Sequence, residues 1–374
     1  MIETEINTGV IEKSPLEKIV DTLEYQKKIK SDIVVPSGMI RYDGLSGLLN
    51  ATNYEYALTD HTHSQISQKL EIPIGYYKRM LSDTPDLLAS NINTWLSRKE
   101  KTKYLLRTFN YDIEGTSNLC RAMLSDRYSI LDNYDVLIAA LEAIKKTGIH
   151  VEIVKAEITE RRMYLHVVAP EIHIEATELL DGYLANTGEA RLNNGIISGM
   201  VITNSEIGLS RFEVSARAQV LKCRNGMHDR DAAFRKTHLG AKMNEGYVEW
   251  SQGTKNKNYE LIISQVSDAV KTYLSTEYLG NLTSRLLAHK YDKIENPKDV
   301  IEVVSAEIGI PEIHQQQILK HFYRDGDESS FGLLSAFTRE SQKVNADLAY
   351  EMESTAMELL PKFHRFDKQV TSKN

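Results

Sequence analysis

Residues 222–242 hold the side chains of this sequence that are best suited to bind phosphate groups. Guanidinium groups pair with phosphate oxygens, and the turn expected at Asn225 and Gly226 exposes backbone N–H groups that can do the same. We expect a helix to begin near Asp229 and to bring several of the later cations to one side. The candidate nucleic-acid-binding residues are Arg224, Arg230, Arg235, Lys236, His238 and Lys242.

A second basic island covers residues 98–107, where aromatic residues are interleaved with the cations. Basic side chains follow a phosphodiester backbone, and aromatic rings stack on unpaired bases with about 1–3 kcal/mol per base. Arg98, Lys101 and Lys103 are therefore further candidates, and the two islands would hold a single strand if they faced one groove. The alternatives are a solvated charged surface for the cations and a place in the core for the aromatic rings.

The distribution of charge favours a local attraction for nucleic acid over a global one. The chain has 374 residues and a net charge of −7, which argues against a protein that coats nucleic acid through its overall charge. Within residues 211–257, however, ten basic residues stand against five acidic ones. A local field of this kind can steer a charged partner to an acidic molecule.

Patterns for catalysis and for metal binding are missing, so we expect no catalytic residue, no metal and no cofactor. His61 and His63 can share one side of an extended segment, but no cysteine or carboxylate pattern completes a tetrahedral site. The phosphate-loop, dinucleotide and Gly-x-Ser-x-Gly fingerprints are absent as well. An enzyme in the form of a metal-dependent nuclease with two carboxylates stays open as an alternative.

Hydropathy and cysteine content predict a cytoplasmic protein. No apolar run approaches the roughly 20 residues that a membrane helix needs. The N-terminus is acidic and polar, without the basic start and apolar stretch of a secretory signal. Cys120 and Cys223 are the only cysteines, and their separation suggests buried thiols in a reducing compartment.

Apolar periodicity predicts strands in the first two thirds of the chain and helices alone in the last third. Ser14 and Pro15 start the first expected helix, and a loop at residues 34–38 ends it. The expected strands are residues 54–58, 104–108, 118–124, 151–158, 163–168, 196–204 and 212–223. The expected helices are residues 16–29, 60–70, 76–81, 132–146, 259–290 with a kink near Gly280, 300–308, 312–323, 331–343 and 345–360.

Strands followed by helices favour the α+β class over a doubly wound sheet. We expect an N-terminal and central antiparallel-type sheet with helices, followed by an all-helical C-terminal third. The expected divisions are a flexible arm over residues 1–15, a mostly helical region over 16–100, an α+β core over 101–257 and a helical region over 258–374.

Several short motifs, taken in their order, resemble a known family over roughly residues 54–360. They are Arg-Ala-Met-Leu-Ser-Asp-Arg-Tyr at residues 121–128 with Leu-Asp-Asn at 131–133, then residues 203–208, 223–227, 235–240 and 332–339. They are similar to the phage/plasmid-like proteins grouped as domain of unknown function 932. The resemblance implies a gene of a phage, plasmid or other mobile element in a bacterial host, and it carries no mechanism or site residue.

The leading hypothesis is a nucleic-acid-binding protein of a mobile element, with single-stranded DNA favoured and a role in recombination or replication. The alternative is a structural or partner-binding protein, such as a virion component or a counter-defence protein. It would assemble with itself as a homo-oligomer, or with a partner, through its helical C-terminal region. One apolar stripe that serves either a core or such assembly consists of Leu261, Ile262, Val266, Val270 and Leu274.

Overall fold

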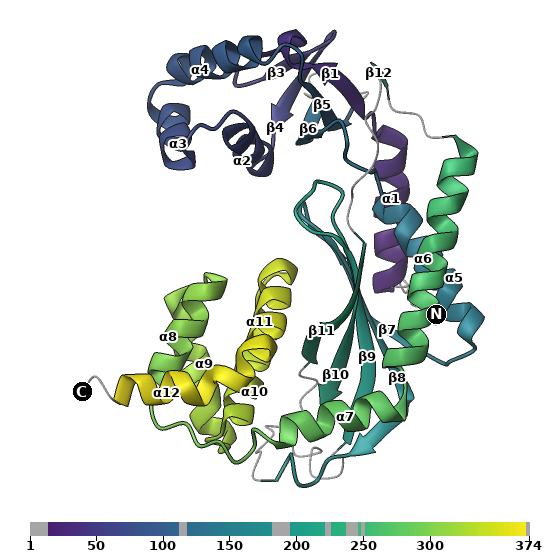
Figure 1. Ribbon diagram of the computed structural model, residues 1–374, viewed down its shortest axis with the longest axis vertical. Helices are drawn as coiled ribbons and strands as arrows, with labels where there is room; N and C mark the ends of the chain where they lie inside the picture. Colours follow the sequence, from purple (N-terminus) through teal and green to yellow (C-terminus); the bar gives the residue numbers. More distant parts are fainter. Residues whose placement is uncertain are drawn as a thin grey trace, which may run out of the picture.

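The computed structural model describes residues 14–111, 118–181, 195–220, 226–236, 246–247 and 251–371. Two β-sheets with helices, followed by a helical C-terminal third, confirm the α+β class predicted from the sequence. Figure 1 shows the first sheet above the second, with the C-terminal helices beside the second sheet. Of the expected N-terminal arm, residues 1–13 lie outside the description.

Seven short strands form the first sheet. In the order in which they lie side by side they are β12 (Gly246–Tyr247), β1 (Ile33–Pro36), β5 (Lys103–Phe109), β6 (Asn118–Ser125), β4 (Tyr54–Leu58), β3 (Leu49–Ala51) and β2 (Ile40–Tyr42). Only β4 and β6 pair in parallel among these strands. The sheet joins strands from the expected regions 16–100 and 101–257, so the boundary expected at residue 100 falls inside one sheet.

Three helices pack on this sheet and share one apolar core with it. They are α2 (Asp60–Lys69), α3 (Ile74–Asp83) and α4 (Pro85–Arg98). The N-terminal cap of α2 is Thr59, whose hydroxyl accepts from the backbone N–H of Thr62 at 3.1 Å. Leu88 and Ile92 of α4 are fully buried against the strands.

The prediction of a loop at residues 34–38 is wrong, because this segment forms β1 and a short 3₁₀ turn, η1 (Ser37–Met39). Val34 and Val35 are both buried, on opposite faces of the strand. A strand that is buried on both faces has no apolar–polar alternation, so periodicity does not reveal it.

Five strands, all antiparallel, form the second sheet. In spatial order they are β11 (Gly226–Lys236), β10 (Phe212–Val220), β9 (Gly195–Asn204), β8 (Met163–Glu175) and β7 (Glu152–Ile158). Strands β7 and β8, expected at residues 151–158 and 163–168, pair as an antiparallel hairpin whose turn covers residues 159–162. One face packs on α1 (Pro15–Ile29), α5 (Asn133–Thr147) and α6 (Gln252–Tyr273), which lie together on one side of the sheet in Figure 1.

The prediction of a helix that begins near Asp229 is wrong, since residues 226–236 form strand β11. His228 and Asp229 are buried within the strand rather than displayed on a helix. The Asp229 carboxylate accepts from Tyr278 at 2.8 Å and from Arg285 at 2.9 Å. Pairing with β10 and these distant partners override the local charge pattern on which the helix prediction rested.

The first helix begins as the sequence predicts. Ser14 caps α1: its hydroxyl accepts from the backbone N–H of Glu17 at 3.2 Å, and the Glu17 carboxylate accepts from the Ser14 N–H at 2.7 Å. This reciprocal arrangement is a capping box, and Pro15 occupies the first helical position, where a missing N–H costs nothing.

The C-terminal third is helical, as expected. After α6 it contains α7 (Thr276–Leu287), α8 (Pro297–Ile308), α9 (Glu312–Asp325), α10 (Ser330–Glu340), η3 (Ser341–Lys343), α11 (Ala346–Leu359), η4 (Leu360–Lys362) and α12 (Phe363–Thr371). The single helix expected over residues 259–290 ends at Tyr273, and α7 starts after Ser275, whose hydroxyl accepts from the N–H of Tyr278 at 3.2 Å. The break therefore lies before Gly280, which is inside α7.

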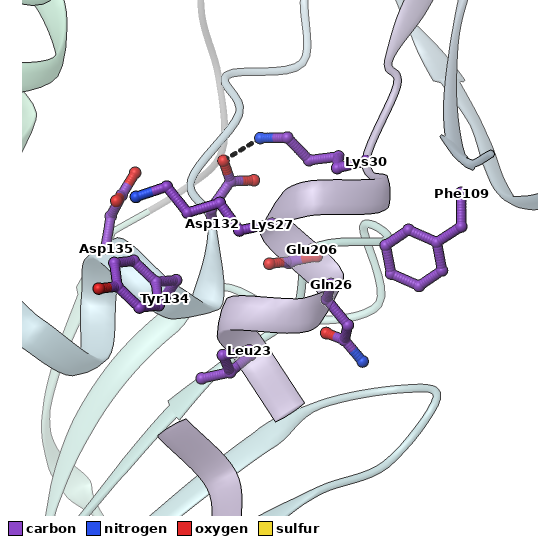
Figure 2. Close-up of a pocket in the computed structure, with 9 residues that line it drawn as sticks. All are labelled: Leu23, Gln26, Lys27, Lys30, Phe109, Asp132, Tyr134, Asp135 and Glu206. Atoms are coloured by element: carbon purple, nitrogen blue, oxygen red, sulfur yellow. Dashed lines mark hydrogen bonds and ion pairs between the residues drawn. The ribbon is translucent and has the colours of Figure 1, made fainter. Parts of the chain in front are cut away.

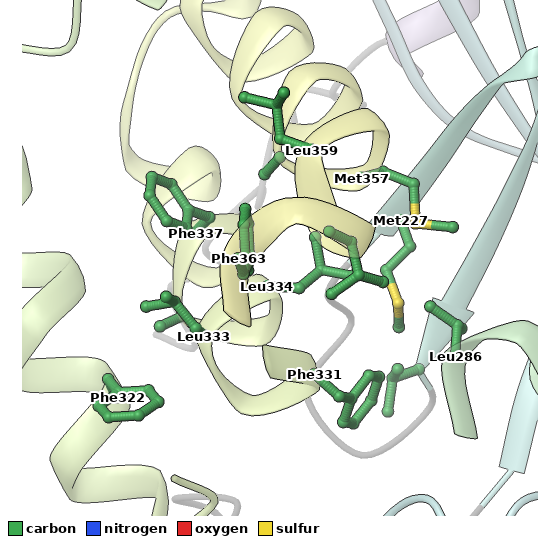
Figure 3. Packing of buried hydrophobic residues seen from close by; sticks show 14 of the residues in the cluster. Met227, Leu286, Phe322, Phe331, Leu333, Leu334, Phe337, Met357, Leu359 and Phe363 are labelled. Atoms are coloured by element: carbon green, nitrogen blue, oxygen red, sulfur yellow. The ribbon is translucent and has the colours of Figure 1, made fainter. Parts of the chain in front are cut away.

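Aromatic and aliphatic side chains of α7 to α12 form their own core (Figure 3). Phe331, Phe337 and Phe363 are fully buried there, and Met227 of β11 joins them from the second sheet. Four residues of the predicted apolar stripe, Ile262, Val266, Val270 and Leu274, are buried in the core against the sheet, whereas Leu261 is 43% exposed. In the part of the chain that is described, no helix has both the length and the apolar character that crossing a membrane requires.

Candidate nucleic-acid interface

A buried cluster of charges holds the junction between the two sheets. Arg107 of β5 is fully buried, and its guanidinium donates to Asp32 at 3.1 Å and to Asp132 at 2.6 Å. A third donation reaches the backbone carbonyl of Glu206 at 3.0 Å. Burial acts to lower the pKa of Arg107, but the carboxylates outweigh it and raise this pKa well above its usual value. Arg107 thus belongs to the structural junction and not to an exposed basic island.

The same junction fastens the end of α1, as Figure 2 shows. Lys30, which follows the helix, forms an ion pair with Asp132. Burial acts to raise the pKa of Asp132, but Arg107 and Lys30 outweigh it and hold this pKa well below its usual range. The cavity at this point has a volume of about 20 Å³, which is room for little more than one water molecule. It supports the fold and is not a ligand site.

Next to this junction lies a larger pocket with a volume of about 310 Å³. It is bounded by α1, by the start of α2 and by the turn of the β7–β8 hairpin. Arg121, Arg161 and Arg162 line it, and the only carboxylates in its described lining are Glu160 and Glu206. We call this site the arginine pocket.

Arg121 of β6 is the least exposed arginine of the pocket, and its side chain is 11% exposed. One guanidinium nitrogen, Nη1, donates to the Glu206 carboxylate at 2.8 Å, and the group stacks on the Phe109 ring, 3.8 Å from its centre. Its Nε and Nη2 are buried and have no hydrogen-bond acceptor among the described residues. A buried donor without an acceptor costs about 1–3 kcal/mol. A phosphate oxygen could supply the missing acceptors after a small movement of the side chain.

The hairpin turn presents the other two arginines. The Thr159 hydroxyl accepts from the backbone N–H groups of Arg161 at 3.1 Å and Arg162 at 3.0 Å, which fixes the turn. The Ser205 hydroxyl donates to the Arg161 carbonyl at 2.8 Å. Arg162 is paired with Glu351 at 2.6 Å. Arg161 is exposed, and its side chain has no ion-pair partner in the part of the chain that is described, so it is available to an anion.

His61 adds a neutral imidazole to the pocket. Its Nε2 donates to the Ile207 carbonyl at 3.0 Å. Burial lowers the pKa of His61; that hydrogen bond opposes the shift, and the nearby charge of Arg161 adds to it. The imidazole is therefore uncharged at neutral pH, and the positive charge of the pocket comes from its arginines.

Strand register brings further cations to the same end of the second sheet. Met163, at the hairpin end of β8, pairs with Asn204 of β9. Phe212, the first residue of β10, pairs with Lys236, the last residue of β11. Arg211 and Lys236 therefore lie at the end of the sheet that carries the hairpin turn.

The candidates from residues 222–242 that the structure describes, Arg230, Arg235 and Lys236, lie on β11. Gly226 pairs with Gln219 of β10 and Lys236 pairs with Phe212, and the seven residue steps between these two partners span about 23 Å, because the register shifts between Asp229 and Phe234. Arg235 lies near the hairpin end, where it is exposed and donates to Glu213 at 2.7 Å. Arg230 and Lys236 are placed on β11, but their side chains are outside the description. The residues of this set that lie wholly outside the described ranges are Arg224, His238 and Lys242.

The second basic island lies away from the pocket. Arg98 ends α4, and its guanidinium lies 5.3 Å from the centre of the Trp95 ring. Lys101 is exposed in the following turn, and Lys103 opens β5. Six residue steps separate Lys103 from Phe109, which lines the arginine pocket, so the two sites are roughly 20 Å apart. The expected common groove therefore does not include the arginine pocket.

Arg121, Arg161 and Arg162 are the site residues that sequence reasoning does not single out. They come from strand β6 and from the turn between β7 and β8, and no local charge count marks them. The adjacent pair Arg161 and Arg162 at the tip of a predicted hairpin is the signal that could have found two of them, because a turn presents such side chains to a ligand.

Within the described residues, no three His, Cys, Asp or Glu side chains are grouped to hold a metal ion. Comparison with family models, with curated proteins and with solved structures gives no match for this chain. The resemblance to the domain of unknown function 932 family therefore stays a prediction.

Proposed function

We propose that the chain binds nucleic acid, with single-stranded DNA as its favoured ligand, at the arginine pocket and the neighbouring basic end of the second sheet. The observation that carries the proposal is the guanidinium of Arg121, two of whose buried nitrogens lack an acceptor in the described chain. It lies in a pocket of about 310 Å³ that two other arginines line.

The chemistry of these side chains suits a phosphate diester. A guanidinium fork matches two phosphate oxygens, and charge-assisted hydrogen bonds of this kind are about twice as strong as neutral ones. Arg161 is exposed next to the pocket, so it can meet the ligand first, and Arg121 can bind it deeper inside. Arg211, which is exposed at the same end of the sheet, can contact an adjacent phosphate.

The recessed position of Arg121 favours a single strand over a duplex. Duplex DNA is stiff over about 150 base pairs and presents its phosphates on a convex surface. A flexible single strand can bend one phosphate into a pocket between α1, α2 and the hairpin turn. A role in recombination or replication in a bacterial host is the part of the proposal that rests on the resemblance to proteins of mobile elements.

Fluorescence polarisation with a labelled oligothymidine of about 30 nucleotides tests the proposal. We expect affinity to fall steeply between about 50 and 200 mM salt, because each phosphate contact contributes about 0.7 to the slope of log K against log salt. The double variant Arg121→Gln/Arg161→Gln is expected to lose two contacts and to reduce that slope by about 1.4. A duplex of the same length is expected to bind more weakly.

The matched control is Arg365→Gln, which removes one exposed cation from α12. It is expected to leave both the affinity and the slope unchanged. Absence of binding to DNA and RNA at low salt would contradict the proposal. So would an unchanged slope in the double variant, since binding would then take place elsewhere.

A further inference from the structure

A second and larger cavity, with a volume of about 880 Å³, lies on the other face of the five-stranded sheet. Strands β7 to β10 form its floor, and α11 with η3 form its opposite wall. Its size falls in the range of cavities that hold small organic ligands, roughly 300–1,000 Å³. Apolar and polar side chains share the lining, and this mixture is typical of such sites.

His166 is the polar group at the floor of this cavity. It is 8% exposed, and it lies on the opposite face of β8 from Leu165 and Val167, which belong to the core under α1, α5 and α6. No described residue forms a hydrogen bond with either ring nitrogen. A buried imidazole without a protein partner, facing a cavity, is a group that a ligand can satisfy.

The charges that act on His166 are all positive. Burial lowers its pKa most, and Arg217, Lys155 and His228 lower it further, to well below its usual value. Lys155 is the residue of β7 that pairs with His166 across the strands. The imidazole is therefore neutral at pH 7. Two cations lie near it, and each is paired with a carboxylate: Lys155 with Glu157 at 2.7 Å and Arg217 with Glu353 at 3.4 Å.

Arg217 is the fixed cation of the cavity. It is 8% exposed; its Nε donates to Glu353 at 3.4 Å and its Nη1 to Gln219 at 3.0 Å. Gly226, on the neighbouring strand, leaves the space for its guanidinium, because a Cβ there would lie 1.8 Å from Nη2. The other titratable side chains in the described lining are Glu152, His173, Tyr350 and Glu353.

We propose that this cavity binds a small organic anion, whose phosphate or carboxylate group contacts His166 between Lys155 and Arg217 and whose apolar part packs on Val168 and Ile197. A neutral imidazole can donate a hydrogen bond to the anion from one nitrogen. The proposal does not depend on nucleic-acid binding, because the arginine pocket has a separate lining at the turn end of the sheet.

Thermal shift measurements on the full chain, with three probes at equal ionic strength, test the proposal. The probes are thymidine 5′-monophosphate, octanoate and inorganic phosphate. At a concentration about a hundredfold above Kd, a true ligand is expected to raise Tm by about 3 °C. A shift with the nucleotide alone identifies a phosphate head, and one with octanoate alone identifies a carboxylate head.

Variants connect the signal to the cavity. His166→Gln is expected to weaken binding about tenfold, whereas His150→Gln, a change at an exposed histidine outside the cavity, is expected to have no effect. Lys155→Gln serves as a second test if His166→Gln does not fold. Arg121→Gln is expected to retain binding, which separates this site from the arginine pocket.

Proton uptake gives an independent readout. An anion next to His166 raises the pKa of the imidazole, so its NMR signals are expected to titrate at a higher pH with ligand than without it. Three results would each overturn the proposal. They are no shift with any probe, inorganic phosphate binding as tightly as the larger anions, and full binding by both the His166 and the Lys155 variants.

Discussion

The buried junction around Arg107 makes a quantitative prediction for the variant Arg107→Met. Methionine has a similar length and no charge, so the change removes the guanidinium and leaves little cavity. Asp32 and Asp132 then lose their buried partner, and the Glu206 carbonyl loses its donor. Removal of one partner from a buried ion pair costs about 3–5 kcal/mol, since the remaining charge stays buried without compensation.

The expected change in Tm follows from this loss of free energy and from the entropy of unfolding, which scales with chain length. The entropy of unfolding is about 2.1 cal/mol/K per residue, or about 0.8 kcal/mol/K for 374 residues. A loss of 3–5 kcal/mol therefore predicts that Tm falls by about 4–6 °C if the chain unfolds as one unit. If the seven-stranded sheet and its helices unfold separately, the decrease is larger, because fewer residues share the cost.

Differential scanning calorimetry at several pH values measures both the loss and its origin. In the native protein the pKa of Asp132 is depressed, so its contribution is present above the unfolded value of about 3.9 and is lost as pH falls below it. In Arg107→Met this pKa is expected to rise, because burial is opposed only by Lys30. Protonation then relieves the buried charge, and the deficit in Tm is expected to shrink between pH 7 and pH 5.

Arg365→Met is the matched control, since Arg365 is exposed on α12, and its Tm is expected to stay within about 1 °C of the native value. If Tm of Arg107→Met falls by less than about 1 °C at pH 7, the cluster does not stabilise the junction and the reasoning is refuted. A deficit that does not change with pH would refute its electrostatic origin.

Three further predictions concern other parts of the fold. Ser14→Ala removes the cap of α1 and is expected to cost about 1 kcal/mol in urea unfolding, whereas Ser14→Asp is expected to cost little. Gly226→Ala places a methyl group 1.8 Å from Arg217 Nη2 and is expected to destabilise the chain by about 1–3 kcal/mol; an unchanged Tm would show that the guanidinium moves freely. Burial raises the pKa of Cys120 to about 12, so in a Cys223→Ser background this thiol is expected to resist maleimide at pH 8 until urea unfolds the chain.

Elements with strong local signals could be predicted from the sequence. The capping box at Ser14 and the strands around the 160–162 turn need only neighbouring residues, and the structure has them where they were expected. Helix α5 also lies where its apolar face predicted a helix, and it ends at Gly148, which has a positive φ of 73°.

Features that depend on distant partners could not be predicted in this way. The charged run after Gly226 is read as a helix in isolation, but β10 supplies the pairing that makes it a strand. In the sequence, Arg107 is one more cation of a basic island, and only the folded structure shows that Asp32 and Asp132 pair with it. The arginine pocket combines residues that are about 40 positions apart in the chain, so no spacing rule identifies it.

The two-residue strand β12 is synthesised well after the other strands of the first sheet, so this sheet cannot be completed until late in translation. Gly246 and Tyr247 complete the open edge of β1, yet about 120 residues separate them from Ser125 at the end of β6. At about 5–20 residues per second, a ribosome delivers this edge about 6–24 s after the rest of the sheet. During that interval β1 presents unpaired backbone groups, so the nascent chain passes through a stage at which another chain could pair with this edge.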